Sequence, residues 1–247
     1  MGLQTSKKIE TKKILLLGYP KSGNTWLGYL LSFLLNAEYL EPYRLMTGLT
    51  HSKSRDVLRS TSGLLEDRPR TIYDAVIKSH HLPPAAEERK RFFQLTDKII
   101  LIVRDPRDVA VSKYHYDKMF KERTRTGICT TMHISFFRTM RNWTRHNTIW
   151  LDENPFVVRY EDLKQNGHAT LMALLCYLDV EIDGSLIDAA LARFSLANLK
   201  GPSESDFSFR FFRKGIVGDH ANHFGRIDHL ICGMTCRQLA RRLGYDL

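Results

Sequence analysis

Short runs rich in apolar residues alternate along this chain with longer stretches of helical spacing. The runs lie at 14–18, 74–80, 97–105 and 155–162. The third contains five consecutive aliphatic residues, from Ile99 to Val103, which is typical of a strand that is covered on both faces. The spacing of apolar residues in the other stretches predicts helices at 24–36, 106–120, 133–150, 168–178 and 184–194.

This alternation predicts an α/β fold with a single doubly wound parallel sheet. Such sheets bind ligands at the carboxyl ends of their strands. Four polar residues lie at or just beyond those ends, namely Lys21, Lys78, His80 and Arg104. We divide the chain into a flexible basic N-terminus, 1–13, and one domain, 14–247. The long polar stretches 41–71 and 201–213 are predicted to be lids over the site.

The segment GYPKSGNTW, residues 18–26, follows the first predicted strand. Its glycines, Gly18 and Gly23, have the spacing of a phosphate-binding loop, but Asn24 stands where nucleotide triphosphatases have a lysine. The lysine of this segment is Lys21, within the loop. Because a helix N-terminus with a nearby lysine attracts anions, the segment predicts a P-loop-like phosphate-binding loop. The alternative is a tight turn with a solvated lysine.

The segment VRDPRDVAVS, residues 103–112, places Arg104 at a strand end and Ser112 in the helix that follows. An arginine fork and a serine hydroxyl both suit phosphate. The alternative is local pairing of the arginines with Asp105 and Asp108.

Two further segments carry candidate chemistry. In RFFRKGIVGD, 210–219, Arg213 and Lys214 precede two glycines and predict a basic loop that reaches an anion. In KSHH, 78–81, a histidine at a strand end has the ordinary pKa of a general base at neutral pH. The alternatives are a solvated basic loop and a structural histidine.

The composition is that of a globular protein, with 43% of the 247 residues hydrophobic and 26% charged. The net charge of +10 favours an anionic partner, such as nucleic acid, anionic lipid, or a phosphorylated or sulfated small molecule. No apolar run reaches the roughly 20 residues of a membrane span, and we expect no secretory signal. The four cysteines match no zinc or redox spacing, so we expect reduced thiols in the cytoplasm.

The first residues, MGLQTSKK, fit the pattern for myristoylation at Gly2. One acyl chain with a basic patch is enough for reversible attachment to a membrane. The N-terminus is therefore a candidate for weak membrane association, and the alternative is a disordered basic segment.

Taken in their order along the chain, the motifs resemble those of the PAPS-dependent sulfotransferase family. Three specific motifs are similar to the family's, namely YPKSGNTW at 19–26, RDPRDVAVS at 104–112 and RKGIVGDH at 213–220. Three weaker ones are KSHHLP at 78–83, the W-x-x-H-x-x-x-W spacing at 143–150 and VVRYEDL at 157–163. The chain departs from the family pattern at Asn24, usually threonine, and at His220, usually tryptophan. The resemblance extends from Ile14 to about Phe224.

The resemblance implies a donor, 3′-phosphoadenosine 5′-phosphosulfate (PAPS), which is bound without a metal and leaves as its product PAP. The 5′ side is expected on Lys21, Ser22, Gly23, Asn24, Thr25 and Trp26. The 3′-phosphate is expected on Arg104, Ser112, Arg213, Lys214 and Gly215. Tyr160 and Leu196 complete the expected donor site. Trp26 is expected to stack on the adenine, with either Leu196 or Phe194 on the other side.

The resemblance also implies three catalytic residues. Lys21 is expected to stabilise the charge that develops on the oxygen between phosphorus and sulfur. His80 is expected to take the proton of the acceptor, and Lys78, on the same strand face, to contact the sulfuryl group. Counting back from the Leu-Pro pair of the motif would select His81 as the base. We prefer His80 because the lysine and the base should share a face.

The predicted function is sulfuryl transfer to a hydroxyl or amine of a small molecule in the cytoplasm. The aromatic residues of 114–137 suit a phenol or a lipid-like alcohol, whereas the basic residues of 41–71 suit an anionic or glycan acceptor. A carbohydrate sulfotransferase is therefore an alternative. A P-loop kinase and a nucleic-acid-binding protein are further alternatives, although we expect no nucleic acid partner. The oligomeric state stays open.

Overall fold

The computed structural model describes residues 11–41, 71–80, 94, 96–124, 131–200, 212 and 214–247. At its centre is a parallel sheet with the strand order β2-β3-β1-β4-β5. The five strands are β1 (Lys12–Leu17), β2 (Glu38–Leu40), β3 (Tyr73–Ser79), β4 (Lys98–Val103) and β5 (Phe156–Arg159). The chain builds one half of the sheet from β1 to β3 and then crosses to the other side of β1. The predicted doubly wound parallel sheet is therefore confirmed.

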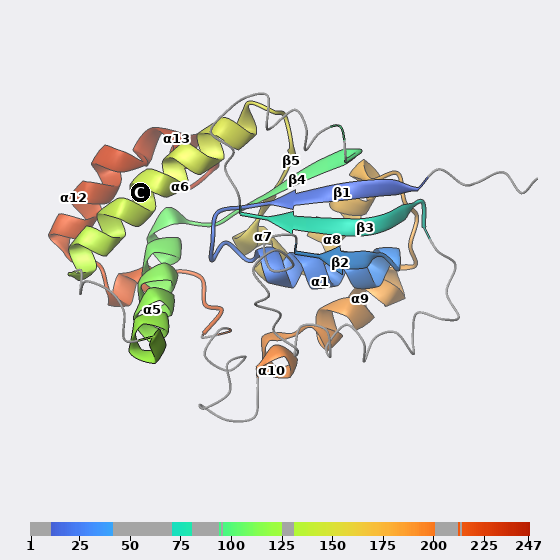
Figure 1. Cartoon of the computed structure of the whole chain (residues 1–247), viewed down its shortest axis with the longest axis horizontal. Helices are drawn as coiled ribbons and strands as arrows, with labels where there is room; N and C mark the ends of the chain where they lie inside the picture. The colour runs from blue at the N-terminus through green and yellow to red at the C-terminus, as the bar shows by residue number, and fades with distance from the viewer. Residues whose placement is uncertain are drawn as a thin grey trace, which may run out of the picture.

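One group of helices runs along the sheet, and another lies beyond the carboxyl ends of its strands. The α-helices of the described residues are α1 (Asn24–Leu35), α5 (Pro106–Thr124), α6 (Met132–Leu151), α7 (Tyr160–Gln165), α8 (Gly167–Tyr177), α9 (Gly184–Arg193), α10 (Leu196–Leu199), α12 (Arg226–Thr235) and α13 (Arg237–Arg242), and Asp219–Asn222 forms the 3-10 helix η1. Figure 1 shows α5, α6, α12 and α13 gathered beyond the carboxyl ends of the strands, while α1, α8 and α9 run along the sheet.

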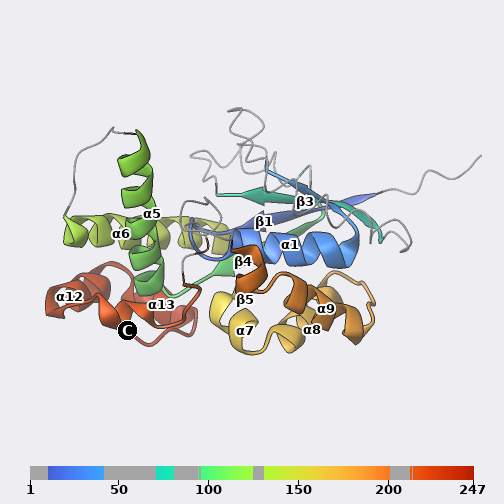
Figure 2. The ribbon, with the colours of Figure 1, turned by 90° about the horizontal axis from the view of Figure 1, so that it is seen from below.

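Alternate residues of the central strand supply two hydrophobic cores. Ile14 and Leu16 belong to a core with α1, α8 and α9, whereas Leu15 and Leu17 belong to a core with α5, α6, α12 and α13. Successive side chains of a strand point to opposite faces, so the uninterrupted aliphatic run is explained by layers on both sides (Figure 2).

The structure differs from the sequence predictions at the end of the fourth strand and in elements that were not predicted, which include α7 and α10. The fourth predicted strand, 155–162, ends at Arg159, because Tyr160 begins α7. Acidic residues in the first turn of α7 and Lys164 in its last turn suit the helix dipole, which favours a helix there. The short edge strand β2 and the C-terminal helices α12 and α13 were not predicted. The N-terminal segment 1–10 and most of both predicted lids, 42–70 and 201–211, lie outside the described residues.

Candidate active site

The loop between β1 and α1 has the backbone of an anion-binding turn. Gly23 has a φ of 103°, and a Cβ there would lie 2.7 Å from the Tyr160 ring, so only glycine fits. Ser22 is fully buried, and its hydroxyl has no hydrogen-bond partner in the described part of the chain. Since buried hydroxyls are nearly always hydrogen-bonded, the Ser22 hydroxyl is a candidate donor to a ligand bound at this loop.

The residues that begin α1 brace this loop from within. The Asn24 side-chain amide donates to the Tyr19 carbonyl at 3.2 Å, which ties the end of the loop to its start. Asn24 and Thr25 are both buried. Asn24, which stands where the family pattern has threonine, therefore contributes a hydrogen bond inside the loop.

Arg104 joins three separate segments at the end of β4. Its guanidinium donates to the carbonyls of Lys21, at 3.4 Å, and Ile216, at 2.9 Å. Its Cζ atom also lies 4.4 Å from the centroid of the Tyr160 ring. The side chain is buried, and its Nε has no partner in the described residues. A buried guanidinium with an unused donor beside the loop is well suited to bind phosphate.

Asp108 fastens the segment 214–220 to α5. Its carboxylate accepts hydrogen bonds from the backbone N–H groups of Gly218, at 2.8 Å, and His220, at 2.9 Å. The His220 Nδ1 lies 2.9 Å from the same carboxylate and donates to it. Burial opposes the charge of Asp108, but the hydrogen bonds of His220 and the charge of Arg104 lower its pKa below the usual value. The carboxylate is thus charged at neutral pH, and His220 contributes a contact of its own where the family has tryptophan.

The basic segment is partly described. Lys214 pairs with the buried Asp219 at 3.0 Å, and Gly215 has a φ of 60°. Ser112 is half-buried on α5, one turn after Asp108 and on the same helix face. Arg213 lies outside the described residues. The structure therefore brings Arg104, the Ser112 face of α5 and the 214–218 backbone together.

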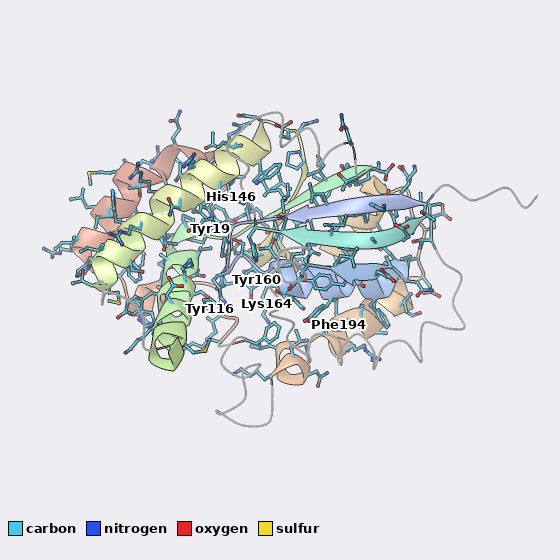
Figure 3. The ribbon with its side chains drawn as sticks, viewed as in Figure 1. Tyr19, Tyr116, His146, Tyr160, Lys164 and Phe194 are labelled. Carbon is cyan, nitrogen blue, oxygen red and sulfur yellow. The ribbon has the colours of Figure 1, made fainter. Side chains whose placement is uncertain are left out.

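An aromatic platform lies beside the loop. Trp26 and Tyr160 meet edge to face, with ring centroids 5.8 Å apart, and Lys164 Nζ lies 5.6 Å from the Trp26 ring. The indole N–H of Trp26 has no partner in the described residues. The Tyr160 hydroxyl donates to the Gly215 carbonyl at 3.3 Å. Figure 3 shows Tyr160 and Lys164 at the end of the sheet.

The structure separates the two candidates for the other side of the adenine. Phe194 is buried between Tyr29 and Phe33, with ring centroids 5.9 and 5.7 Å away, and belongs to the core. Leu196 instead lies beside Gly215, because a Cβ on that glycine would be 3.0 Å from a Leu196 methyl group. Leu196 is thus the candidate next to the platform.

Lys78 lies at the site, and its ammonium is shared between two partners. Its Nζ donates to Thr25 Oγ1 at 2.9 Å and to Glu41 Oε1 at 2.8 Å. The Lys78 and Glu41 side chains are both largely buried, at 6% and 11% exposure. Lys78 thus contacts Thr25 at the start of α1 while it is paired with Glu41. Any contact of Lys78 with a sulfuryl group would be made by an ammonium that already has these partners.

His80 is oriented by the loop. Its Nδ1 lies 2.7 Å from the Gly18 carbonyl oxygen. A carbonyl only accepts, so Nδ1 carries the hydrogen and Nε2 has the free lone pair. Burial of the ring, followed by the charge of Lys78, lowers the pKa of His80 to about 3, although the residue as a whole keeps an exposed surface. The imidazole is therefore neutral at pH 7 with Nε2 unprotonated, and its lowered pKa makes it a weaker base than the ordinary histidine that the sequence predicted. His81 lies outside the described residues.

Lys21 lies against an aromatic ring from α5. Its Nζ is 4.5 Å from the centroid of Tyr116, within the range of a cation–π contact. Lys21 also has a φ of 74°, which is uncommon for a residue with a side chain and is found at functional sites. Figure 3 shows Tyr116 projecting from α5 toward this end of the sheet.

Three residues of the site were not predicted as site residues from the sequence: Glu41, Asp108 and Tyr116. Each acts through a partner that is distant along the chain, such as Lys78 for Glu41 and Gly218 for Asp108. The only sequence signal was general, since Asp108 belongs to the 104–112 motif and Tyr116 to the segment considered for the acceptor.

No cluster of three or more potential metal ligands occurs among the described residues. Cys176, Cys232 and Cys236 are free thiols, and Cys129 lies outside the described residues. Among the helices that the structure describes, none has the length and apolar content needed to cross a membrane.

Comparison with known proteins agrees with the motifs. A family model described as the sulfotransferase domain matches residues 11–244. The chain is 28% identical over 241 residues to sulfotransferase 1B1 of Mus musculus, which covers 85% of this chain and 77% of that protein. It is 26% identical over 239 residues to sulfotransferase 2B1 of Mus musculus, which covers 90% and 69%.

Solved structures share the fold. Mouse sulfotransferase SULT7A1 complexed with PAP aligns with a TM-score of 0.64 at 21% identity, over 94% of this chain and 87% of that one. Retinol dehydratase in complex with androsterone and PAP aligns with a TM-score of 0.64 at 16% identity, over 95% and 82%. Since the family match spans nearly the whole chain, and its motifs meet at one edge of a doubly wound sheet, this chain belongs to the PAPS-dependent sulfotransferase family.

Proposed function

We propose that this enzyme transfers the sulfuryl group of PAPS to a hydroxyl or amine of a small-molecule acceptor by in-line displacement. Cytoplasmic activity is part of the proposal. Lys21, His80 and Lys78 are the proposed catalytic residues, and the donor residues are those implied by the motifs.

Three buried donors that have no acceptor among the described residues carry this proposal. They are Ser22 Oγ, Trp26 Nε1 and Arg104 Nε. Each belongs to, or contacts, the loop that begins α1, and two of them lie beside the Tyr160 ring. Buried donors cost free energy when they are left unpaired, so their convergence on one loop supports a ligand rich in acceptor oxygens. A phosphorylated nucleotide with an aromatic base fits both the donors and the platform.

In this proposal, different residues remove the acceptor's proton, stabilise the leaving group and bind the 3′-phosphate. When bound, PAPS supplies an activated sulfuryl group and a phosphate that can leave. Nε2 of His80 takes the acceptor's proton as the new bond to sulfur forms. As the bond from sulfur to the bridging oxygen breaks, Lys21 stabilises the negative charge on the departing phosphate. Arg104, Ser112, Lys214 and Gly215 hold the 3′-phosphate in place, together with Arg213.

The acceptor is proposed to be a phenol or a lipid-like alcohol. Tyr116 brings an aromatic ring to the proposed catalytic lysine, and Tyr114 and His115 precede it on α5. A ring next to the reacting centre favours an apolar or aromatic acceptor over a glycan. The basic residues that would favour a glycan lie in 42–70, outside the described residues.

The test is transfer of radiolabelled sulfate from PAPS to a panel of phenols, apolar alcohols and glycans. We expect label in the phenols or alcohols. Lys21→Ala should lower turnover by roughly two to three orders of magnitude, because a transition-state contact is lost. PAP should still bind this variant measurably in calorimetry. In the same assay, His80→Ala should lose turnover and His81→Ala should retain it.

Lys118→Ala is the matched control, because this lysine is exposed on α5 and is not in the proposed site. Unchanged turnover in Lys21→Ala would contradict the mechanism. Label only in glycans would leave sulfuryl transfer in place and replace the proposed acceptor.

A further inference from the structure

Two neighbouring helices expose large apolar side chains to solvent. On α12, Ile227, Leu230 and Met234 are 62%, 64% and 70% exposed. Their spacing of three and four residues places them in one stripe. On α6, Ile134 and Phe137 are 46% and 40% exposed. Single exposed apolar residues are ordinary, but a contiguous stripe marks an interaction surface.

The two helices lie side by side beyond the carboxyl edge of the sheet. His133 of α6 lies 2.6 Å from Asp228 of α12, and the Thr144 hydroxyl donates to the Thr235 carbonyl at 3.0 Å. Both views show this pairing, with α13 continuing from α12 (Figures 1 and 2). The start of α6 therefore lies beside the start of α12.

The same helices carry an unusual concentration of arginine. Seven arginines of α6, α12 and α13 are exposed, namely Arg138, Arg141, Arg145, Arg226, Arg237, Arg241 and Arg242. The only acidic residue within these three helices is Asp228, which is buried and bound to His133. No ion pair links any of the seven to another residue in the described part of the chain. The exposed surface of these helices, which we call the arginine face, thus combines seven arginines that have no ion pair within the described residues with the apolar stripe of α12.

Charge complementarity decides which partner fits the arginine face. A second copy of the chain in a two-fold dimer would place this face against itself and oppose like charges. Nucleic acid would satisfy the arginines but would leave the apolar stripe in water. The surface of an anionic bilayer satisfies both, because phosphates neutralise arginine and the acyl region accepts the leucine, isoleucine and methionine side chains.

We propose that the arginine face docks this enzyme on anionic lipid membranes. The inference does not rest on the proposed donor or acceptor, since none of its residues belongs to the candidate active site. It differs from attachment through Gly2, which would use the N-terminal segment. Docking would place the carboxyl edge of the sheet, and with it the candidate active site, near the membrane surface.

Vesicle co-sedimentation of the full chain tests the proposal. We expect binding to vesicles of phosphatidylcholine with 30% phosphatidylserine, little binding to pure phosphatidylcholine, and release as the salt concentration rises. Arg141→Gln/Arg145→Gln should weaken partitioning by about fivefold for each arginine. Leu230→Ser/Met234→Ser should weaken it to a similar extent by removing the inserted side chains.

Two matched controls locate the contact. Met172→Ser removes a methionine of α8 that is 45% exposed, and it should change nothing. Lys7→Gln/Lys8→Gln removes two charges from the N-terminus and should weaken binding less than the arginine pair does. Transfer to a water-soluble acceptor should be unchanged in all variants, which verifies that they are folded.

Three results would overturn the proposal. One is the absence of binding to anionic vesicles. A second is loss of binding in Lys7→Gln/Lys8→Gln but not in the arginine variant, which would assign the contact to the N-terminus. The third is a dimer in solution that Leu230→Ser/Met234→Ser dissociates, without vesicle binding, which would make this face an interface between copies.

Discussion

Tyr116 shows how one residue can hold the group on which the proposed chemistry depends. The ammonium of Lys21 lies 4.5 Å from its ring centroid, and Lys21 itself has a strained backbone. A lysine has many rotamers, so a fixed partner reduces the entropy that must be lost before it can contact a departing phosphate.

We expect Tyr116→Leu to lower turnover by about fivefold, because a cation–π contact contributes about 1 kcal/mol. Tyr116→Phe keeps the ring face and should retain most of the turnover. PAP affinity should change little in either variant, since the lysine acts mainly as the phosphate leaves. Single-turnover rates with saturating PAPS provide the measurement. An equal loss in both variants would assign the effect to the hydroxyl and not to the ring.

The predictability of single residues depended on how local their partners are. Arg104 and the loop around Lys21 could be predicted because a strand end followed by glycine or a helix start is visible in the sequence. Glu41 could not, since its role arises only from the buried pair with Lys78, 37 positions away. Leu196 and Phe194 were indistinguishable by sequence, and only packing around Tyr29 assigns Phe194 to the core.

At the scale of elements, the contact between α5 and the 214–220 segment organises the proposed 3′-phosphate site. Asp108 anchors the segment on the helix side, where it accepts from two backbone N–H groups and from the His220 ring. The segment contains Gly215 and Gly218, both with positive φ, so it has little conformational preference of its own.

Asp108→Asn should therefore loosen this segment. The amide has one acceptor oxygen where the carboxylate has two, and its NH₂ group would face a backbone donor. We expect PAP affinity to fall by roughly tenfold or more, as for loss of hydrogen bonds to a charged group. Calorimetry with PAP measures the change. Asp117→Asn on the same helix, where the aspartate pairs with Lys113, is the control and should leave affinity unchanged. Equal affinity of Asp108→Asn and the native enzyme would show that the segment is held by other contacts.

Strands were easier to predict than the elements at their ends. β1 and β4 contain short aliphatic runs that are buried on both faces, and their length distinguishes them from α1, which is buried as fully but is twice as long. The three-residue β2 has too few residues for a pattern, and its place is fixed by pairing with β3. α7 was included in the preceding strand because Phe156 to Tyr160 has strand-like residues. The helix begins where Glu161 turns inward to accept the Asp105 N–H at 3.0 Å.

For the whole molecule, the second core contains a titratable group that links stability to pH. His146 of α6 is 3% exposed and lies between Tyr19 and Trp150, with ring centroids 5.7 and 6.4 Å away. Burial lowers its pKa to about 4, while a hydrogen bond with Asn147 works in the other direction. In the unfolded chain the pKa returns to its ordinary value, near 6.5.

Folding stability should consequently fall with acid in a defined window. Below pH 6.5 the histidine is protonated in the unfolded state, whereas in the folded state it is protonated only below about pH 4. The free energy of unfolding therefore decreases as the pH is lowered through this range. At pH 5 the loss from His146 amounts to about 2 kcal/mol. Urea unfolding at pH 7.5 and pH 5 measures this loss of stability.

His146→Gln should be less stable than the native protein at pH 7.5 but should lose about 2 kcal/mol less on going to pH 5. His168→Gln, at an exposed histidine of α8, should show the native acid loss. If His146→Gln loses as much as the native protein, the acid sensitivity comes from other groups. In that case His146 would still contact Tyr19 at the start of the loop, but it would not make the stability of the fold depend on pH.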